Sequence, residues 1–160
     1  MARTIVVNPN QSEEDNITRA INETNLTTHE SKFILYAFPY PIDGVVQDDP
    51  DIDNTTLTLD STLDSKYTGG DTFTYHRIHL RKQWEIVKGT NLILEMPKST
   101  PLNHESFFAI MGKYLALRKE SIETVFEVNP TDPNDITVRV VAKPNSYLYI
   151  GEFRVKLKLV

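Results

Sequence analysis

The chain has 160 residues, of which 39% are hydrophobic and 24% charged, and its net charge is −5 at pH 7. This composition predicts a globular chain long enough for one core, and no apolar run suits a signal peptide or a membrane span, so we expect a protein made and folded inside a cell, without membrane contact. Cysteine is absent, which excludes a disulfide framework, a thiolate metal site and a cysteine nucleophile.

The N-terminal region holds a short apolar run and then a helix signal. Ile5, Val6 and Val7 alternate over too few residues to form a sheet alone. We therefore expect this segment to add to a sheet edge, in the same chain or in a neighbour, and to contact a partner. Ser12-Glu13-Glu14-Asp15 is a capping box and predicts a helix with a thin apolar stripe, formed by Ile17, Ala20, Ile21 and Thr24.

A long acidic loop is predicted over residues 40–53. Between Asp43 and Asp64 there are seven aspartates and no Lys or Arg. The first and second halves of the chain have a similar order of features, and this loop is the longest segment of the first half with no counterpart in the second. Insertions of this kind often carry a specialised role. We predict that it contacts a partner through Asp48, Asp49 and Asp51.

The same loop contains a weak calcium motif. Asp49, Asp51 and Asp53 have the 1, 3, 5 spacing of a calcium-binding loop. Position 6 is Asn54 where Gly is usual, position 12 is Asp60 where Glu is usual, and no helices are predicted on either side. We therefore expect no metal site and a solvated acidic loop, with calcium binding as the alternative.

Two strands are predicted after the loop. Residues 54–59, Asn-Thr-Thr-Leu-Thr-Leu, form a Thr-rich strand, and apolar residues alternate over 72–80 with a change of phase at His76-Arg77. Phe73 and Tyr75 share one face, whereas Ile78 and Leu80 have the other parity. A β-bulge, or a strand leaving one sheet for another, would produce this change.

The second half predicts a stronger helix and a hairpin. Thr100-Pro101 or Asn103 begins the helix, and apolar residues recur at i, i+3, i+4, i+7 and i+8, namely Phe107, Ile110, Met111, Tyr114 and Leu115. Turn signals flank residues 136–142, which we expect to pair with 147–159. In the last strand apolar residues alternate with Arg154, Lys156 and Lys158, so one face is buried and the other is cationic.

The charge of this C-terminal region is opposite to that of the acidic loop. Residues 136–160 contain five Lys or Arg and one acid, Glu152. The asymmetry would align copies of the chain head to tail, whereas two solvated faces of opposite sign are the more ordinary interpretation.

The two halves of the sequence repeat one order of features. Each has a proline before a helix, then Glu-Ser (30–31 and 120–121), a strand and a Tyr-x-Gly turn. We predict an α+β fold of two tandem similar units, residues 1–83 and 84–160, each one helix plus a short antiparallel sheet, packed as one compact β-rich body. Tyr67 with Gly69 and Tyr149 with Gly151 are predicted to be equivalent, with each glycine at a tight turn or close backbone approach. Chance similarity of two β-rich stretches is the alternative.

Few residues suggest catalysis. None of the four histidines, His29, His76, His79 and His104, belongs to a metal-binding motif, and nucleophile-elbow, phosphate-binding and dinucleotide-binding motifs are absent. No spacing singles out a pair of carboxylates. The few basic residues of this acidic chain argue against a nucleic-acid partner. We expect no enzyme and no cofactor.

A carbohydrate-binding β module is a further alternative. In that interpretation Trp84, Tyr36 and Tyr40 are exposed and form a stacking platform. Otherwise Trp84 covers the junction between the two units.

Several of these motifs together resemble a known class of proteins. Leu57-Thr58-Leu59, Lys66-Tyr67-Thr68-Gly69, Phe73-Thr74-Tyr75-His76-Arg77-Ile78 and the final Tyr149-Ile150-Gly151 are similar to motifs of small virion structural proteins of tailed bacteriophages. In those chains a Thr-rich strand, a Tyr-x-Gly turn and a Tyr-x-Arg-Ile strand recur, often in tandem. The resemblance covers most of residues 30–160.

The resemblance implies a non-enzymatic particle protein present in many copies. It implies synthesis in the host cytoplasm, location in the virion, homo-oligomerisation, and contact with other virion proteins such as the major capsid protein. We expect a head decoration or minor capsid protein, with a collar, tail or baseplate protein as the alternative. The resemblance carries no catalytic residue, and it marks Tyr67, Gly69, Arg77, Tyr149 and Gly151 as structural.

Overall fold

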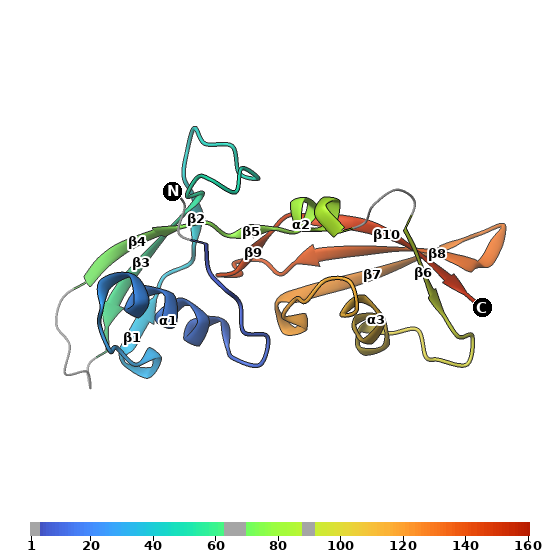
Figure 1. Ribbon diagram of the computed structural model, residues 1–160, viewed down its shortest axis with the longest axis horizontal. Helices are drawn as coiled ribbons and strands as arrows, with labels where there is room; N and C mark the ends of the chain where they lie inside the picture. Colours follow the sequence, from blue (N-terminus) through green and yellow to red (C-terminus); the bar gives the residue numbers. More distant parts are fainter. Residues whose placement is uncertain (1–3, 63–69, 88–91) are drawn as a thin grey trace. The chain divides into compact units, whose positions relative to one another are not determined.

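The fold class is α+β, as predicted. The computed structural model describes residues 4–62, 70–87 and 92–160. These residues form three α-helices, two four-stranded sheets and one two-stranded sheet (Figure 1). Among them, no helix is long and apolar enough to cross a bilayer.

The chain forms two compact units. Unit 1 contains the residues up to Ile78 together with Pro144–Tyr149, and unit 2 contains His79–Lys143 together with Ile150–Val160. The chain therefore leaves unit 1 after Ile78, returns to it for six residues and ends in unit 2. The division into repeat units 1–83 and 84–160 stays a prediction.

Unit 1 begins with the predicted helix. Helix α1 spans Glu13–Asn25, and the Ser12 hydroxyl accepts a hydrogen bond from the Asp15 backbone N–H at 3.1 Å. The predicted capping box is thus confirmed at its N-cap. Ile17 and Ile21 are buried, so the thin apolar stripe faces the core of unit 1.

The sheet of unit 1 is built around one long strand. Strand β3 (Thr55–Ser61) pairs along its length with β4 (Gly70–Tyr75), while β1 (Ile34–Tyr36) and β2 (Tyr40–Pro41) pair with the two ends of its other edge. All pairings are antiparallel. A 3₁₀ turn, η1 (Ser31–Phe33), precedes β1. Leu57, Phe73 and Tyr75 are buried on the face that α1 covers (Figure 1).

The change of apolar phase at His76-Arg77 marks a change of sheet. Strand β4 ends at Tyr75, and β5 (Ile78–His79) pairs with β9 (Tyr149–Ile150) in the two-stranded sheet. The predicted sheet switch is confirmed. The strand predicted to reach Leu80 is too long, because Leu80 begins helix α2 (Leu80–Val87), in which Leu80 and Trp84 are buried four residues apart. This helix was not predicted.

Unit 2 contains the other four-stranded sheet. Its order is β6–β10–β8–β7, with bounds Ile93–Met96, Glu152–Leu159, Asp132–Ala142 and Ile122–Asn129. Strand β10 is antiparallel to β8 over Glu152–Lys158 and parallel to β6. The predicted C-terminal hairpin and the alternation of buried and exposed residues in β10 are both confirmed.

Two helices pack in unit 2, where one was predicted. Helix α3 spans His104–Met111, and Asn103 caps it by accepting from the Ser106 N–H at 2.9 Å. The predicted helical face extends too far, because Leu115 lies beyond the end of the helix. The core is aromatic: Phe107 meets Phe126 edge-on and Trp84 stacks on Phe153, with ring centroids 6.2 Å and 5.0 Å apart. A second 3₁₀ turn, η2 (Lys119–Ser121), precedes β7.

Candidate interaction surface on the acidic loop

The acidic loop of unit 1 rests on a buried asparagine. Asn54 is completely buried between the loop and β3. Its side-chain NH₂ donates to the carbonyls of Gln47 and Arg77, at 2.8 Å and 3.0 Å, and its side-chain oxygen accepts from the Arg77 N–H and the Thr55 hydroxyl, at 2.8 Å and 2.7 Å. Four hydrogen bonds satisfy the amide completely, so Asn54 joins the middle of the loop to the chain after β4.

Arg77 extends this network inside unit 1. Its side chain is buried and donates from Nε to the Thr55 hydroxyl at 2.8 Å and from the guanidinium to the Ser146 carbonyl at 3.1 Å. Burial lowers the pKa of Arg77, and the neighbouring Tyr75 and Glu13 oppose that shift. Glu13 accepts from the Ser146 hydroxyl at 2.5 Å. The buried arginine therefore lies in a hydrogen-bonded setting near a carboxylate, which lowers the cost of burying its charge.

Further hydrogen bonds hold the loop at its ends. The Ile42 N–H donates to the Asn54 carbonyl at 2.9 Å, and Nδ1 of His76 lies 2.9 Å from the Ile52 carbonyl. The Gln47 side chain donates back to the Ile42 carbonyl at 3.2 Å. The loop is thus held at its start, middle and end.

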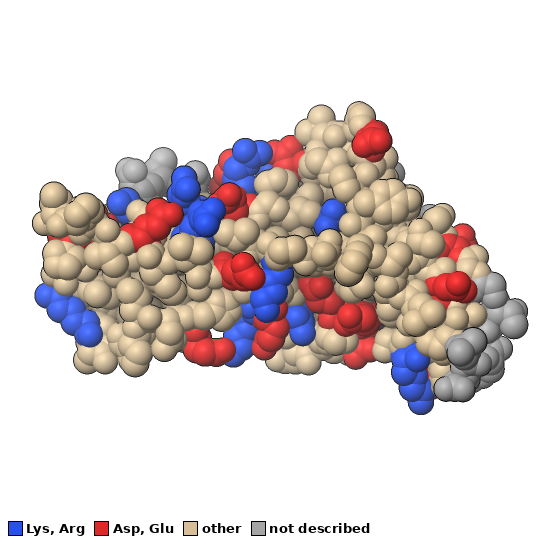
Figure 2. All heavy atoms as spheres, turned by 180° about the vertical axis from the view of Figure 1, so that it is seen from behind, with Lys and Arg blue, Asp and Glu red and all other residues tan. Residues whose placement is uncertain are grey.

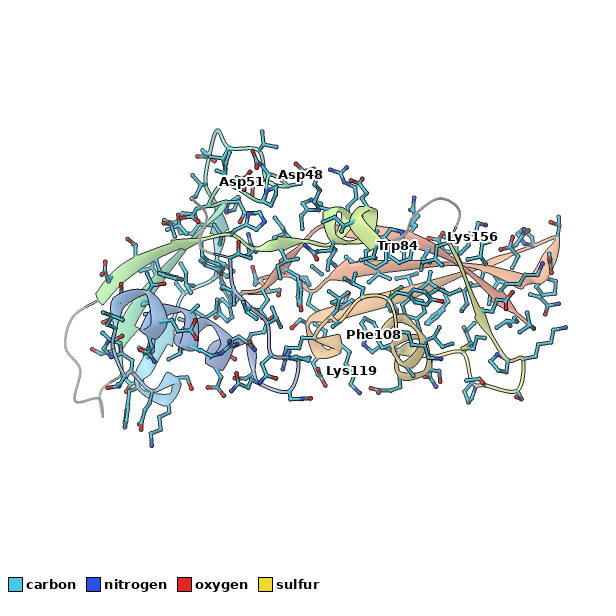
Figure 3. The ribbon with its side chains drawn as sticks, in the orientation of Figure 1. Asp48, Asp51, Trp84, Phe108, Lys119 and Lys156 are labelled. Atoms are coloured by element: carbon cyan, nitrogen blue, oxygen red, sulfur yellow. The ribbon has the colours of Figure 1, made fainter. Side chains whose placement is uncertain are left out.

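The outer part of the loop presents carboxylates and one apolar side chain. Asp48 and Asp51 are carried on it (Figure 3), and Val46 is 61% exposed. Asp49 accepts from the Asp51 backbone N–H at 3.0 Å, and Asp53 accepts from the Thr74 hydroxyl at 3.2 Å. These carboxylates are turned to local backbone and side-chain donors. Within the described ranges, no group of three acidic or histidine side chains could hold a metal ion, so Asp49, Asp51 and Asp53 form no calcium cluster here.

The N-terminal segment lies on its own unit. Thr4 forms a parallel bridge with His76, and Ile5 is 4% exposed. Asn16 of α1 accepts from the Asn8 N–H at 2.7 Å. Of the predicted contact residues, Ile5 is therefore a core residue, Val7 is half-buried, and Val6 at 77% exposure remains open to a partner. The described part of the segment therefore adds to its own chain, which is one of the two alternatives predicted.

One Tyr-x-Gly motif can be located and the other cannot. Tyr149 is buried, and Gly151 has φ +79°, with the position of a Cβ only 2.4 Å from the His79 ring. Gly151 thus combines a left-handed conformation with a close approach, as predicted. Tyr67 and Gly69 lie outside the described residues, so their equivalence to Tyr149 and Gly151 stays a prediction.

The proposed aromatic platform does not form. Trp84, labelled in Figure 3, is 5% exposed. It stacks on Phe153, so it is not exposed as the carbohydrate-binding alternative requires. Tyr36 is half-buried, its hydroxyl is hydrogen-bonded to Thr18, and burial raises its pKa to about 12. Tyr40 alone of the three is half-exposed.

The solvent face of β10 carries Arg154, Lys156 and Lys158, but the solvent face of the whole unit 2 sheet also carries acidic side chains. Across the solvent face of unit 2, Arg139 lies 3.7 Å from Glu152 and Lys156 lies 3.5 Å from Asp135. Exposed pairs of this kind contribute little to stability. They offset part of the positive charge of this strand, and the alignment of copies by charge stays a prediction.

Asn54 is the important residue that sequence reasoning missed. In the sequence, Asn54 stands at the sixth position of the weak calcium motif and at the start of a predicted strand. The sequence does offer one signal: Asn54 directly precedes an apolar strand, and Arg77 lies between two apolar strands. A polar side chain buried at such a position is costly unless it has hydrogen-bond partners.

A comparison with family models matches residues 7–159 to one described as a family of unknown function (DUF7941). Searches of curated proteins and of solved structures found no match.

Proposed function

The chain belongs to the family DUF7941, whose function is unknown, and we propose that it is a structural component of a tailed-phage virion that acts by subunit contact. A head decoration or minor capsid protein is the favoured position in the particle, with a collar, tail or baseplate position as the alternative. The observation that carries this proposal is the acidic loop, which is held in place by the buried Asn54 and exposes charge and Val46.

A loop held in this way is suited to binding a protein. Ordering a flexible loop on association costs free energy, and hydrogen bonds already made in the free protein remove part of that cost. Carboxylates at the loop surface favour a partner with Lys or Arg and increase the rate of encounter. The loop thus supports a contact role, and it has no feature of a reaction site.

The internal repeat also belongs to this proposal. In both units a parallel N-terminal segment (Thr4 beside His76, β6 beside β10), a helix and a 3₁₀ turn precede three antiparallel strands in the order β1–β3–β4 or β7–β8–β10. Glu30-Ser31 and Glu120-Ser121 occur at η1 and η2 respectively. This shared order supports two tandem similar units, with β2 and the acidic loop as an insertion in the first.

The carbohydrate-binding alternative is weaker after the structure, because Trp84 is buried in unit 2. A non-enzymatic role and contact with the major capsid protein remain proposals. Both are expected if the chain is a particle protein and its exposed acidic loop binds a partner surface rich in Lys or Arg.

The loop proposal is tested by removing charge without changing shape. We expect Asp48→Asn, Asp49→Asn and Asp51→Asn together to leave a folded protein, since an Asn side-chain oxygen still accepts the Asp51 N–H. Incorporation into particles, measured by quantitative mass spectrometry of purified virions, should fall at least about tenfold, as expected when a contact of about 1.4 kcal/mol or more is lost.

The matched control removes three charges from the solvent face of unit 2. Glu95→Gln, Glu123→Gln and Glu127→Gln change the net charge by the same amount, and we expect normal incorporation. Equal incorporation of the loop variant and the control would refute a contact role for the loop.

A further inference from the structure

The first turn of the acidic loop contains a pair of residues that can react with each other. Asp43-Gly44 is the one Asp-Gly dipeptide in the sequence, and both residues are exposed. In Figure 2, which shows the molecule from behind, this loop projects into solvent and carries an acidic side chain at its outer end. The side chain of an aspartate can react with the backbone nitrogen of the next residue and close a succinimide ring. Glycine favours this reaction most, because it has no Cβ to crowd the nitrogen.

The surroundings of Gly44 leave this attack open. Its φ of +78° lies in the left-handed region, and a Cβ placed on it would meet nothing within 4 Å. Across the described parts of the chain, no hydrogen bond holds the Gly44 N–H or the Asp43 carboxylate. The Gly44 nitrogen and the carboxyl carbon of Asp43 can therefore approach each other without first breaking a contact.

The other aspartates of the loop are followed by residues whose nitrogen is not available. Asp49 precedes Pro50, which has no N–H. The N–H groups that follow the other three aspartates are already bonded, from Asp49 to the Val46 carbonyl at 3.3 Å, from Ile52 to the Asp49 carbonyl at 3.3 Å and from Asn54 to the Tyr75 carbonyl at 3.0 Å. Within residues 40–53, Asp43 is thus the aspartate whose neighbouring nitrogen is open to reaction.

Gln47 holds the two sides of this turn. Its side-chain NH₂ donates to the carbonyls of Ile42 and Val45, at 3.2 Å and 3.4 Å. These two carbonyls flank Asp43-Gly44, so the turn is held at its ends while the peptide group between Asp43 and Gly44 keeps its N–H exposed. Groups that are kept next to each other react faster than groups that must first meet.

We propose that Asp43 is a site of spontaneous covalent modification, at which the chain converts to isoaspartate. The Gly44 nitrogen forms a bond to Cγ of Asp43 and gives up its proton, and the protonated carboxyl group loses its hydroxyl, so one water leaves and a succinimide remains. Water then adds back to the ring. Breaking the bond between the nitrogen and Cγ restores aspartate, whereas breaking the bond between the nitrogen and the backbone carbonyl carbon of Asp43 gives isoaspartate.

The product changes the loop without changing its charge. Isoaspartate keeps one carboxylate, but its main chain runs through Cβ and Cγ, which lengthens the path between Ile42 and Val45 by one atom. Gln47 can then no longer bridge both carbonyls in the same geometry, whereas the hydrogen bonds of Asn54 lie outside the lengthened segment. The modification lies in the loop of the proposed contact, but it does not rest on that contact, because it is detected chemically in the isolated chain.

The test is to age the folded full chain at neutral pH beside a synthetic peptide of residues 40–47, until the peptide has converted. Digestion with an endoproteinase that cleaves before aspartate but not before isoaspartate, followed by mass spectrometry, locates the product. We expect isoaspartate at residue 43 and not at Asp51 or Asp53. A chain that still has aspartate at residue 43 when the peptide has converted would overturn the proposal, and so would equal conversion at Asp51.

Three variants make the result specific, and circular dichroism checks that each is folded. Asp43→Glu would have to close a larger ring, and Gly44→Ala places a Cβ beside the attacking nitrogen. Each should slow the formation of the isomer at residue 43 at least about tenfold, which corresponds to a barrier higher by about 1.4 kcal/mol. Asp51→Glu, in the same loop, is the matched control and should leave conversion at residue 43 unchanged. Undiminished conversion in both Asp43→Glu and Gly44→Ala would contradict the assignment.

Discussion

Two glycines with the same backbone conformation differ in their surroundings. Gly44 and Gly151 have φ of +78° and +79°, where L-residues are strained. A Cβ at Gly44 would meet nothing within 4 Å, whereas a Cβ at Gly151 would lie 2.4 Å from Cε1 of His79. Replacing Gly44 by alanine should therefore cost only the backbone strain. Replacing Gly151 by alanine should cost that strain together with a steric clash.

We predict that Gly44→Ala lowers the free energy of unfolding by about 1 kcal/mol, the cost of a left-handed L-residue. Gly151→Ala should cost about 3 kcal/mol or more, because the clash adds to the strain. In a His79→Ala background the cost of Gly151→Ala should fall toward that of Gly44→Ala. Urea unfolding of the wild type, the three single variants and the His79→Ala/Gly151→Ala double variant measures these costs. If the His79 background leaves the cost of Gly151→Ala unchanged, the close approach is not what selects glycine.

Tyr36 gives the fold a dependence on alkaline pH. Burial raises its pKa to about 12, from 10.0 for an ordinary tyrosine, and the hydrogen bond with Thr18 opposes part of that shift. The folded protein thus holds the phenolic proton more tightly than the unfolded chain. The resulting stability is complete below pH 10 and is lost as the pH rises through about 12.

We therefore predict that the free energy of unfolding falls more slowly between pH 10 and 12 in Tyr36→Phe than in the wild type. The decline should not disappear, because burial also raises the pKa of Tyr75 and Tyr147. Parallel slopes for Tyr36→Phe and the wild type would argue against this assignment.

At the scale of elements, the acidic loop depends on the Asn54 side chain. Asn54→Ala would leave the buried N–H and carbonyl of Arg77 without their side-chain partners, and each orphaned buried group costs about 1–3 kcal/mol. We predict a loss of about 3 kcal/mol or more in urea unfolding, with faster amide hydrogen exchange across residues 42–53. Asn10→Ala, at an exposed position, should change stability by less than about 0.5 kcal/mol. Slow exchange in the loop of a folded Asn54→Ala protein would show that other contacts hold it.

The N-terminal segment behaves as part of unit 1. Ile5 is buried, while Val6 beside it is exposed and its carbonyl accepts from the Arg19 guanidinium at 2.8 Å. We predict that Ile5→Ala costs about 2–4 kcal/mol, as for other buried isoleucines, and that Val6→Ala costs less than about 0.5 kcal/mol. Thermal unfolding compares the two. Similar small effects at both positions would show that the segment contributes little to the stability of unit 1.

Local patterns in the sequence predicted most of the elements of the fold. The Ser12 cap, the alternation of residues 153–159 and the change of phase at His76 each depend on neighbours in the chain, and all three are confirmed. Helix α2 was missed because Ile78 and Leu80 satisfy strand parity while Leu80 and Trp84 satisfy helical spacing. The base of the loop was missed because Asn54, Arg77 and Ser146 meet across 23 and 69 residues. A single sequence contains no local signal for such contacts.

At the scale of the whole molecule, the two units share an order of elements and differ in what they expose. Unit 1 carries the acidic loop, and unit 2 carries a solvent face on which basic and acidic side chains pair. If the repeat arose by duplication, the second unit shows what the scaffold needs for folding. The acidic loop, which only unit 1 has, is then the part of the chain that the proposed contact uses.

The central claim is that this chain is a structural part of a virion. The most direct test is quantitative mass spectrometry of gradient-purified particles from a tailed phage that encodes it. We predict that the chain co-purifies with the particles in many copies each, at a fixed ratio to the major capsid protein. Its absence from purified particles, or a trace amount that washing removes, would contradict the claim.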